Sequence, residues 1–435
     1  MRRGVCLSEE TCLPQTIRLF APLELQSPSF PDTKNMTSPQ AKPFLSQARS
    51  WLFSAICFVL PMKASYIYTL SALLLLVWIA DGGLRAKFEA ILRSKLCLAF
   101  IAYFGVYVLA MLWTEDTTSG WNMVGRHVPF LLFLLYWSSA EPGYRERYVS
   151  ALLAGLCVCA LLAYYNWIQL HWFPDWPRGV KVFKDPDDTA PFVDRILYTP
   201  ILALGAYFSL RRAVFATSMT ARMLPALIAA FLVFNLFFSG GRAGTVMFLA
   251  LCVALAFERI KARGKALLLC VLVLPLLLVT AYRTQSYFAE RVDFAVRDIK
   301  VFPENPNTSV GQRLVFWATS IRLFADHPLG GVGSGDYEKE YNQLKSQYWD
   351  TTPESHNPHN QFLMTAATTG LLGLAALFCI FYFAASGSDF RTRTMLLGFA
   401  VVCLFESYLW RSNTSLAFAA VLAALAAGKT PESKS

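Results

Sequence analysis

The most polar stretch of the sequence spans residues 283–360 and ends in His-Asn-Pro-His-Asn, directly before an apolar run. An imidazole titrates near neutral pH, so His359 is a candidate general base that removes a proton from a hydroxyl group. Asn360 beside it is a candidate for orienting a sugar or phosphate, and His356 is a further substrate-binding candidate. Alternatively the two histidines share a metal ion, but Pro358 disfavours a regular helical pair and no carboxylate motif accompanies them.

Five arginines form a second group of candidates, because each is expected at or beyond the outer end of a membrane span. They are Arg126, Arg195, Arg242, Arg313 and Arg411. Charges near the bilayer are costly and are usually functional or paired, and a guanidinium binds phosphate oxygens through two parallel hydrogen bonds. We therefore expect these arginines to bind a phosphate or diphosphate. The alternative is a structural role at the membrane interface, or in salt bridges to Asp194, Asp336 or Glu406.

The elements that position these side chains are predicted to be membrane-spanning helices. Hydrophobic residues make up 55% of the chain, charged residues only 16%, and the mean hydropathy is +0.41; soluble domains carry about a quarter charged residues. Apolar runs long enough to cross about 30 Å of hydrocarbon recur throughout. We predict an all-α polytopic membrane protein with about twelve spans. They are expected near 45–62, 65–80, 95–113, 123–139, 148–170, 193–210, 222–239, 242–258, 266–282, 358–384, 394–410 and 412–427.

Basic residues predict which loops face the cytoplasm, because short cytoplasmic loops are enriched in Lys and Arg. Alternate loops hold clusters of them, at 85–95, 145–147, 211–222, 259–265 and 391–393. The other set of loops includes the acidic Glu115-Asp116 turn and the polar stretch 283–360, which are therefore expected on the outer face. These clusters also account for the net charge of +10, so a nucleic-acid partner is not expected.

The chain is expected to divide into five segments. They are a disordered cytoplasmic tail at 1–43, spans at 44–282, an outward catalytic loop at 283–357, spans at 358–427 and a cytoplasmic tail at 428–435. The loop contains no cysteine, which argues against a disulfide framework or thiolate metal site there. Apolar residues at helical spacing predict a helix over Leu314–Phe324 that stops at His327-Pro328, and a second short helix over Tyr337–Tyr348.

Four short motifs resemble those of the bacterial O-antigen ligase and O-antigen polymerase superfamily. They are Ser-Gly-Gly-Arg-Ala-Gly at 239–244, Arg-x3-Trp at 313–317, His-Pro-Leu-Gly-Gly-Val-Gly at 327–333 with one glycine more than the family pattern, and His-Asn-Gln-Phe-Leu at 359–363. The resemblance covers about a quarter of the chain. It implies a GT-C type glycosyltransferase of the inner membrane that uses undecaprenyl-diphosphate-linked glycans at the periplasmic face, without a divalent metal or other cofactor.

The same resemblance implies that Arg242 and Arg313 are the family's essential arginines and His359 its essential histidine. On this hypothesis the two arginines, helped by Arg126, Arg195 or Arg411, hold the donor diphosphate while His359 deprotonates the acceptor hydroxyl.

Within the superfamily, the O-antigen ligase that transfers glycan to lipid A–core is favoured, because one outer loop dominates and no soluble domain follows the last span. We expect a monomer surrounded by membrane lipids. The alternatives are an O-antigen polymerase, a protein O-oligosaccharyltransferase and, outside the enzymes, a lipid-linked glycan transporter. A transporter would be expected to have charges deep within several spans and internal repeats, which the sequence lacks.

Overall fold

The computed structural model describes residues 41–177, 188–260, 262–284 and 286–426 of the 435-residue chain. All contacts discussed below lie within one compact unit, Lys42–Ser435. The predicted tails at 1–43 and 428–435 lie outside the described residues, apart from positions 41–43 at the start of the first helix.

The described residues form helices joined by loops and contain no β-strand, which confirms the all-α prediction. The first half comprises α1 (Ala41–Val59), α2 (Ala64–Ala80), α3 (Leu84–Arg93), α4 (Lys95–Leu109), α5 (Thr117–Arg126), α6 (Val128–Ser139), α7 (Arg145–Trp172) and α8 (Arg195–Phe215). The second half comprises α9 (Met219–Phe238), α10 (Arg242–Arg259), α11 (Arg263–Thr284), α12 (Ser286–Val301), α13 (Ser309–Asp326), α14 (Tyr337–Ser346), α15 (Gln361–Ala385), α16 (Phe390–Val402) and α17 (Ser412–Ala426).

Each of the twelve predicted spans overlaps a helix, since apolar segments in lipid must satisfy their backbone hydrogen bonds internally. By length and composition, four helices of the described chain can cross a membrane. They cover Lys95–Leu112, Pro142–Trp172, Met219–Phe238 and Gln361–Ala385. The pair α2–α3, bent by 115°, would make a fifth if it counts as one span. The chain is therefore a polytopic helical membrane protein, and the number twelve stays a prediction.

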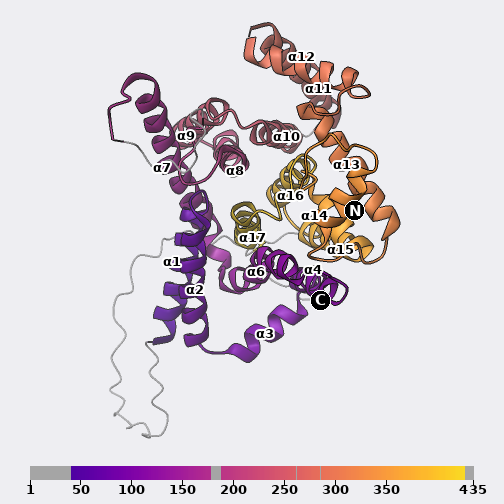
Figure 1. Ribbon diagram of the computed structural model, residues 1–435. Helices are drawn as coiled ribbons and strands as arrows, with labels where there is room; N and C mark the ends of the chain where they lie inside the picture. The colour runs from indigo at the N-terminus through magenta and orange to yellow at the C-terminus, as the bar shows by residue number, and fades with distance from the viewer. Residues whose placement is uncertain (1–40, 178–187, 261, 285, 427–435) are drawn as a thin grey trace, which may run out of the picture. The chain divides into compact units, whose positions relative to one another are not determined.

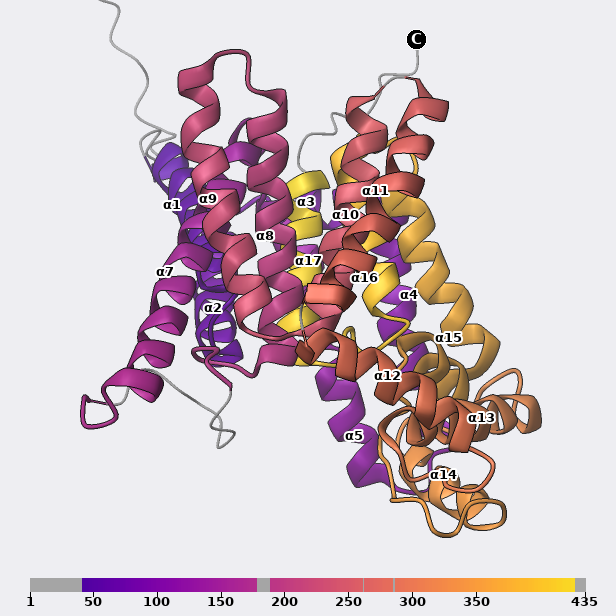
Figure 2. The same cartoon turned by 90° about the horizontal axis from the view of Figure 1, so that it is seen from above.

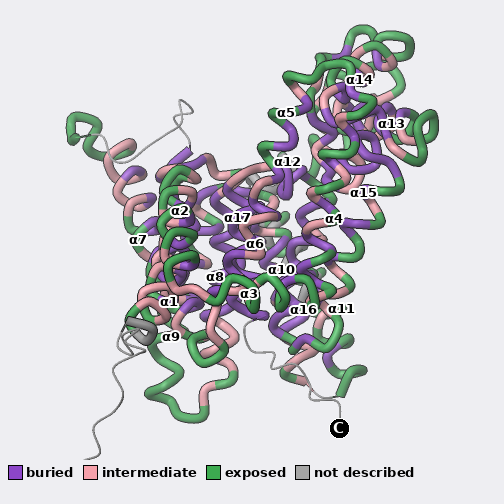
Figure 3. Tube along the Cα trace, turned by 90° about the horizontal axis from the view of Figure 1, so that it is seen from below, coloured by how far each residue is buried: buried purple, intermediate pink, exposed green. Residues whose placement is uncertain are grey.

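The bundle packs around α17, in which every residue from Asn413 to Ala426 is buried. A helix that is apolar on all sides lies in a protein core or in lipid, and α17 is covered by α2, α6, α7, α8 and α16. In Figure 3, α17 lies in the middle of the helix bundle and is coloured as buried.

Figure 2 shows the α8–α9 and α10–α11 connections at one end of the bundle and α5, α12, α13 and α14 at the other. These two basic connections thus lie at the opposite end of the bundle from the polar stretch, and the side of the membrane that each end faces stays a prediction. Both helices predicted in the polar stretch are confirmed: α13 begins after the Thr308 cap, whose Oγ1 accepts a hydrogen bond from Gly311 N at 3.1 Å, and α14 begins at Tyr337. The sequence analysis did not predict α12. In Figure 1, α13 lies beside α15, and α14 packs against α13.

The predicted span 394–410 is wrong in its second half. Helix α16 ends at Val402, and residues 403–411 form a loop of turns that leads into α17. This loop carries Glu406, whose charge is costly inside a span but is compensated here by hydrogen bonds and a cation, described below.

Helix α15 is broken at Gly370, where φ is 64° and ψ is −155°. The backbone of residues 328–333 inserts at this break. Leu371 N and Leu372 N donate to the carbonyls of residues 328 and 329 at 2.8 and 3.3 Å, while the amides of residues 332 and 333 donate to the carbonyls of residues 367 and 368 at 2.9 and 3.1 Å. The insertion satisfies backbone groups that a broken membrane helix would otherwise leave unpaired. The glycine-rich motif at 327–333 therefore fastens the polar stretch to α15.

Gly331 is the position where this insertion tolerates no side chain. Its φ is 67°, and a Cβ atom there would overlap the backbone of Thr368 and Thr369. We predict that Gly331→Ala lowers the thermal midpoint of the purified protein in detergent, because overpacking costs about 1–3 kcal/mol and the left-handed backbone adds to this. The matched control is Gly105→Ala on the exposed face of α4, where a Cβ meets nothing within 4 Å. Equal midpoints for the two variants would contradict this role of the insertion.

Candidate active site

A cavity of about 410 Å³ lies where α8, α10 and α13 begin. Arg195 is the first residue of α8, Arg242 the first of α10 and Ser309 the first of α13, and all three line the cavity. Arg313, one turn further along α13, lines it as well. The remaining wall includes Glu406 and Tyr408 from the loop 403–411. The structure thus brings together three of the five predicted arginines.

The Ser-Gly-Gly-Arg turn positions Arg242. Gly240 has a φ of 65°, a left-handed conformation that glycine adopts without steric cost. A Cβ on Gly241 or Gly244 would overlap Thr199 of α8, so both glycines allow α10 to start in direct contact with α8. The glycines of this turn therefore set the position of the first residue of α10, Arg242, relative to α8.

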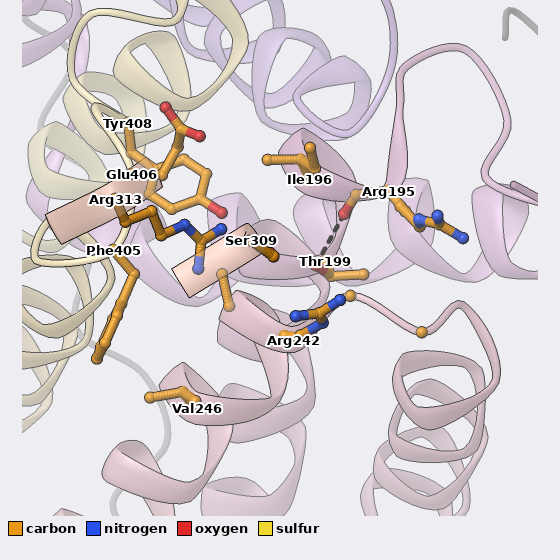
Figure 4. A pocket seen from close by; sticks show the side chains of 13 residues that line it. Arg195, Ile196, Thr199, Arg242, Val246, Ser309, Arg313, Phe405, Glu406 and Tyr408 are labelled. Atoms are coloured by element: carbon orange, nitrogen blue, oxygen red, sulfur yellow. Dashed lines mark hydrogen bonds between the residues drawn. The ribbon is translucent and has the colours of Figure 1, made fainter. Parts of the chain in front are cut away.

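Figure 4 shows the Arg242 and Arg313 side chains extending toward the space between α10 and α13, with Arg195 on the opposite side of the cavity from Arg313. Arg242 and Arg313 are exposed. Arg313 forms no hydrogen bond or ion pair with any residue that the structure describes. Its guanidinium is therefore available to an anion.

The start of α10 adds positive potential to that of the arginines. The first backbone N–H groups of a helix have no intrahelical acceptor and carry a partial positive charge, so an uncapped helix N-terminus binds phosphate and other anions. Helix α10 has no side-chain cap, whereas amides at the start of α8 donate to Asp188 and Asp194. Amides at the start of α13 donate to Asp298 and Thr308. Arginine is the disfavoured charge at this position, yet α8 and α10 both begin with it. Such a departure from the local rule is expected at a functional site. The arrangement suits a ligand with several negative charges.

His359 lies beside this cavity and is hydrogen-bonded to Glu406, which lines it. Its Nδ1 donates to Oε2 of Glu406 at 2.7 Å, which leaves Nε2 for a substrate hydroxyl. The ring stacks on Phe316 of α13 at 5.6 Å between centroids, and the side chain is 31% exposed. The His359 backbone has a φ of 52°, a costly conformation for a non-glycine residue that is typical of functional sites.

Asn357 forms hydrogen bonds to both His359 and Glu406 and so holds them in position. Its Oδ1 accepts from His359 N at 3.0 Å and from Ser407 Oγ at 2.6 Å, and its Nδ2 donates to Glu406 Oε1 at 2.8 Å. Ser407 N also donates to Glu406 Oε1, at 3.0 Å. Asn357 and Glu406 are 1% and 5% exposed. The network lets Glu406 orient the imidazole in the way that the buried carboxylate of a catalytic triad orients its histidine.

Glu406 stays ionised despite its burial. Burial alone would raise its pKa, but the hydrogen bond and charge of His359, the charge of Arg411 and the Ser407 N–H lower the pKa from 4.5 to about 2. A carboxylate at neutral pH accepts only, so the His359 Nδ1 is the donor.

The other two predicted arginines lie outside the cavity wall, around Trp410. The Arg126 guanidinium lies 4.2 Å from the centre of the Trp410 ring, and that of Arg411 lies 5.2 Å from it. The His356 ring is 5.8 Å away. Arg411 also pairs with Glu406 at 3.7 Å, as the structural alternative suggested.

The structure separates the two histidines that were alternatives for a metal site. His356 faces Trp410 whereas His359 bonds to Glu406. No three His, Cys, Asp or Glu side chains lie together in the part of the chain that the structure describes.

Asn360 has a structural role at this point. Its Oδ1 caps α15 by accepting from Phe362 N and Leu363 N at 2.9 and 3.1 Å, and its Nδ2 donates to Leu404 O at 3.2 Å. Because these bonds occupy its amide group, we keep Asn360 out of the substrate site proposed below.

Sequence analysis considered Glu406 only as a salt-bridge partner and did not single out Asn357. One signal was available: Glu406 is the sole Asp, Glu, Lys or Arg in the predicted span 394–410, and a lone charge in a span is functional until shown otherwise.

The low pKa of Glu406 makes a prediction about stability. Its folded-state pKa lies below the ordinary value, so the carboxylate stabilises the fold fully above pH 4.5 and progressively less as the pH falls toward 2. At neutral pH we expect Glu406→Gln to lose about 1.5–3 kcal/mol, measured as a lower thermal midpoint in detergent. The midpoints of wild type and variant should converge on acidification. Glu338→Gln, at an exposed position of α14, is the control; a gap that persists at low pH would contradict the assignment.

Part of the chain is similar to a known protein family. The O-antigen ligase family matches residues 227–378, about a third of the chain, which run from α9 into α15 and contain Arg242, Arg313 and His359. A comparison with curated proteins found no match. The match confirms the predicted resemblance, and the matched segment contains all four of the motifs that carry it. Over residues 227–378, the chain is similar to the O-antigen ligase family.

Proposed function

We propose that this protein is an O-antigen ligase of the bacterial inner membrane. It transfers O-antigen glycan from undecaprenyl diphosphate to a sugar hydroxyl of lipid A–core at the periplasmic face. The observation that carries the proposal is the cavity lined by Arg195, Arg242 and Arg313 at the uncapped start of α10, beside the His359–Glu406 pair. It offers a diphosphate a cationic site and offers a hydroxyl a base.

In this proposal the donor diphosphate occupies the cavity. Arg242 and Arg313 hold its oxygens by charge-assisted hydrogen bonds, and Arg195 and the uncapped N-terminus of α10 add positive potential. These charges stabilise the diphosphate leaving group as the bond between sugar C1 and the phosphate oxygen breaks. Preorganised cations thus supply the charge stabilisation, and no step in this scheme calls for a divalent metal.

His359 activates the acceptor. Its Nε2 accepts the proton of the acceptor hydroxyl while that oxygen forms the new bond to C1, and the ionised Glu406 stabilises the resulting imidazolium. Attack opposite the leaving diphosphate inverts the configuration at C1. The products are the extended acceptor and undecaprenyl diphosphate, and the proton is on His359.

Genetic complementation tests the reaction. A deletion strain that carries wild type is expected to make the O-antigen ladder of its lipopolysaccharide, and one that carries His359→Ala is expected to lack it and to accumulate polymerised chains on undecaprenyl diphosphate. Core that carries a single repeat unit would instead identify a polymerase. A ladder that persists in the deletion strain would overturn the proposal and leave protein glycosylation or transport.

The matched pair Arg313→Lys and Arg322→Lys tests the two-pronged phosphate contact. Both arginines are exposed on α13, but only Arg313 lines the cavity; Arg322 lies 4.0 Å over the Tyr348 ring. Lysine retains the charge and loses the planar fork, so we expect Arg313→Lys to reduce glycan transfer by roughly tenfold to hundredfold. Transfer is measured with purified protein and lipid-linked donor. Full activity of Arg313→Lys would refute the bidentate contact, and Arg322→Lys should match wild type.

A further inference from the structure

A second cationic site surrounds Trp410, which is 5% exposed. Three separate segments meet there: Arg126 at the end of α5, His356 in the loop after α14, and Arg411 immediately before α17. We call these four residues the Trp410 cluster. They are far apart in the sequence, so only the fold brings them together.

The charges of the Trp410 cluster are only partly balanced by protein carboxylates. Arg126 contacts the indole ring but forms no hydrogen bond or ion pair with the residues that the structure describes. Arg411 has Glu406 at 3.7 Å, but that carboxylate already accepts hydrogen bonds from His359, Asn357 and Ser407. Asp194 also interacts electrostatically with Arg411, but its Oδ1 accepts from Leu197 N at the start of α8. Both carboxylates near Arg411 therefore have other partners, and Arg126 has no carboxylate partner among the described residues.

The cluster also presents unused hydrogen-bond donors. Trp410 Nε1 and Arg411 Nε are buried and have no hydrogen-bond partner among the described residues. Buried donors are normally paired, so an acceptor is expected from a ligand. A guanidinium stacked on an aromatic face keeps the N–H groups along its edge available, and their fork matches phosphate oxygens.

The Trp410 cluster is distinct from the cavity lined by Arg195, Arg242 and Arg313, called the donor cavity below because the donor diphosphate is proposed to bind there. Arg126, His356 and Arg411 do not line that cavity, whereas Glu406 lines it, bonds to His359 and pairs with Arg411. The Glu406–His359 pair thus links the two cationic sites. With the donor diphosphate in the cavity, an anion at the Trp410 cluster would belong to the molecule that brings its hydroxyl to His359.

We infer that the Trp410 cluster binds a phosphate group of the acceptor saccharide. The inference rests on the proposed function for the identity of the acceptor, but the binding itself does not require transfer. Arg126 supplies the principal contact, Arg411 and Trp410 Nε1 supply further donors, and together they hold the acceptor next to His359.

Binding is measured first, so that the result does not depend on activity. A fluorescently labelled core oligosaccharide is titrated onto the purified full-length protein in detergent, with its phosphate groups intact and after their chemical removal. Wild type is expected to bind the phosphorylated form about tenfold more tightly, and inorganic phosphate should compete. Arg126→Gln should bind both forms equally, at the level of wild type with the dephosphorylated form. Arg126→Lys should recover part of the difference.

Two controls define the contrary outcomes. Arg322→Gln, on an exposed part of α13 at the same end of the bundle, should bind like wild type, and Arg126→Gln should melt like wild type. Equal wild-type affinity for the two oligosaccharides would overturn the inference. So would an Arg126→Gln variant that weakens both forms alike, or one that weakens phosphatidylglycerol binding instead.

Transfer assays separate this inference from the proposed function. Arg126→Gln should raise the KM for phosphorylated acceptor while the donor KM and kcat change little, and Arg313→Lys should act on the donor. A raised donor KM in Arg126→Gln would place the residue in the donor site and refute the inference. Absence of transfer by wild type, with the phosphate-dependent binding intact, would refute only the ligase reaction.

Discussion

The carboxylate of Glu406 is the interaction on which the site depends. It is taken out of water, a cost that is repaid only because His359, Asn357, Ser407 and Arg411 surround it with donors and positive charge. These partners come from the loop before α15 and the loop before α17, so the charge ties two distant segments to one point. Without the Glu406 carboxylate, the His359 side chain, the loop 403–411 and the wall of the arginine-lined cavity would all lose a common anchor.

A second constraint explains how a long polar stretch can be held rigidly beside a membrane bundle. Backbone groups at the break in α15 must find partners, and the residues 328–333 provide them. Gly331 and Gly370 allow the two backbones to approach without a Cβ between them. Helix α13 continues directly into this insertion, so Arg313 and Phe316 are held against α15 and the cavity by main-chain bonds rather than by side-chain packing alone.

The two cationic sites have different physical origins. In the cavity lined by Arg195, Arg242 and Arg313, the arginines combine with the uncapped N-terminus of α10, so part of the positive potential comes from the backbone. Around Trp410 the cations are placed by stacking on an indole ring and share one carboxylate. Both are connected to His359 through Glu406, which suits the proposed reaction, in which two large substrates must meet at one base.

The sequence by itself determined the helical membrane architecture, the helices α13 and α14, and the candidate roles of Arg242, Arg313 and His359. Those follow from hydropathy, periodicity and short motifs, which are local properties. Only the tertiary structure decided which arginines share a cavity, that Glu406 lies in a loop rather than a span, and that Asn360 caps α15. Such results depend on contacts between residues dozens to hundreds of positions apart, such as Arg126 with Trp410, and no local pattern encodes which distant partner a side chain will meet.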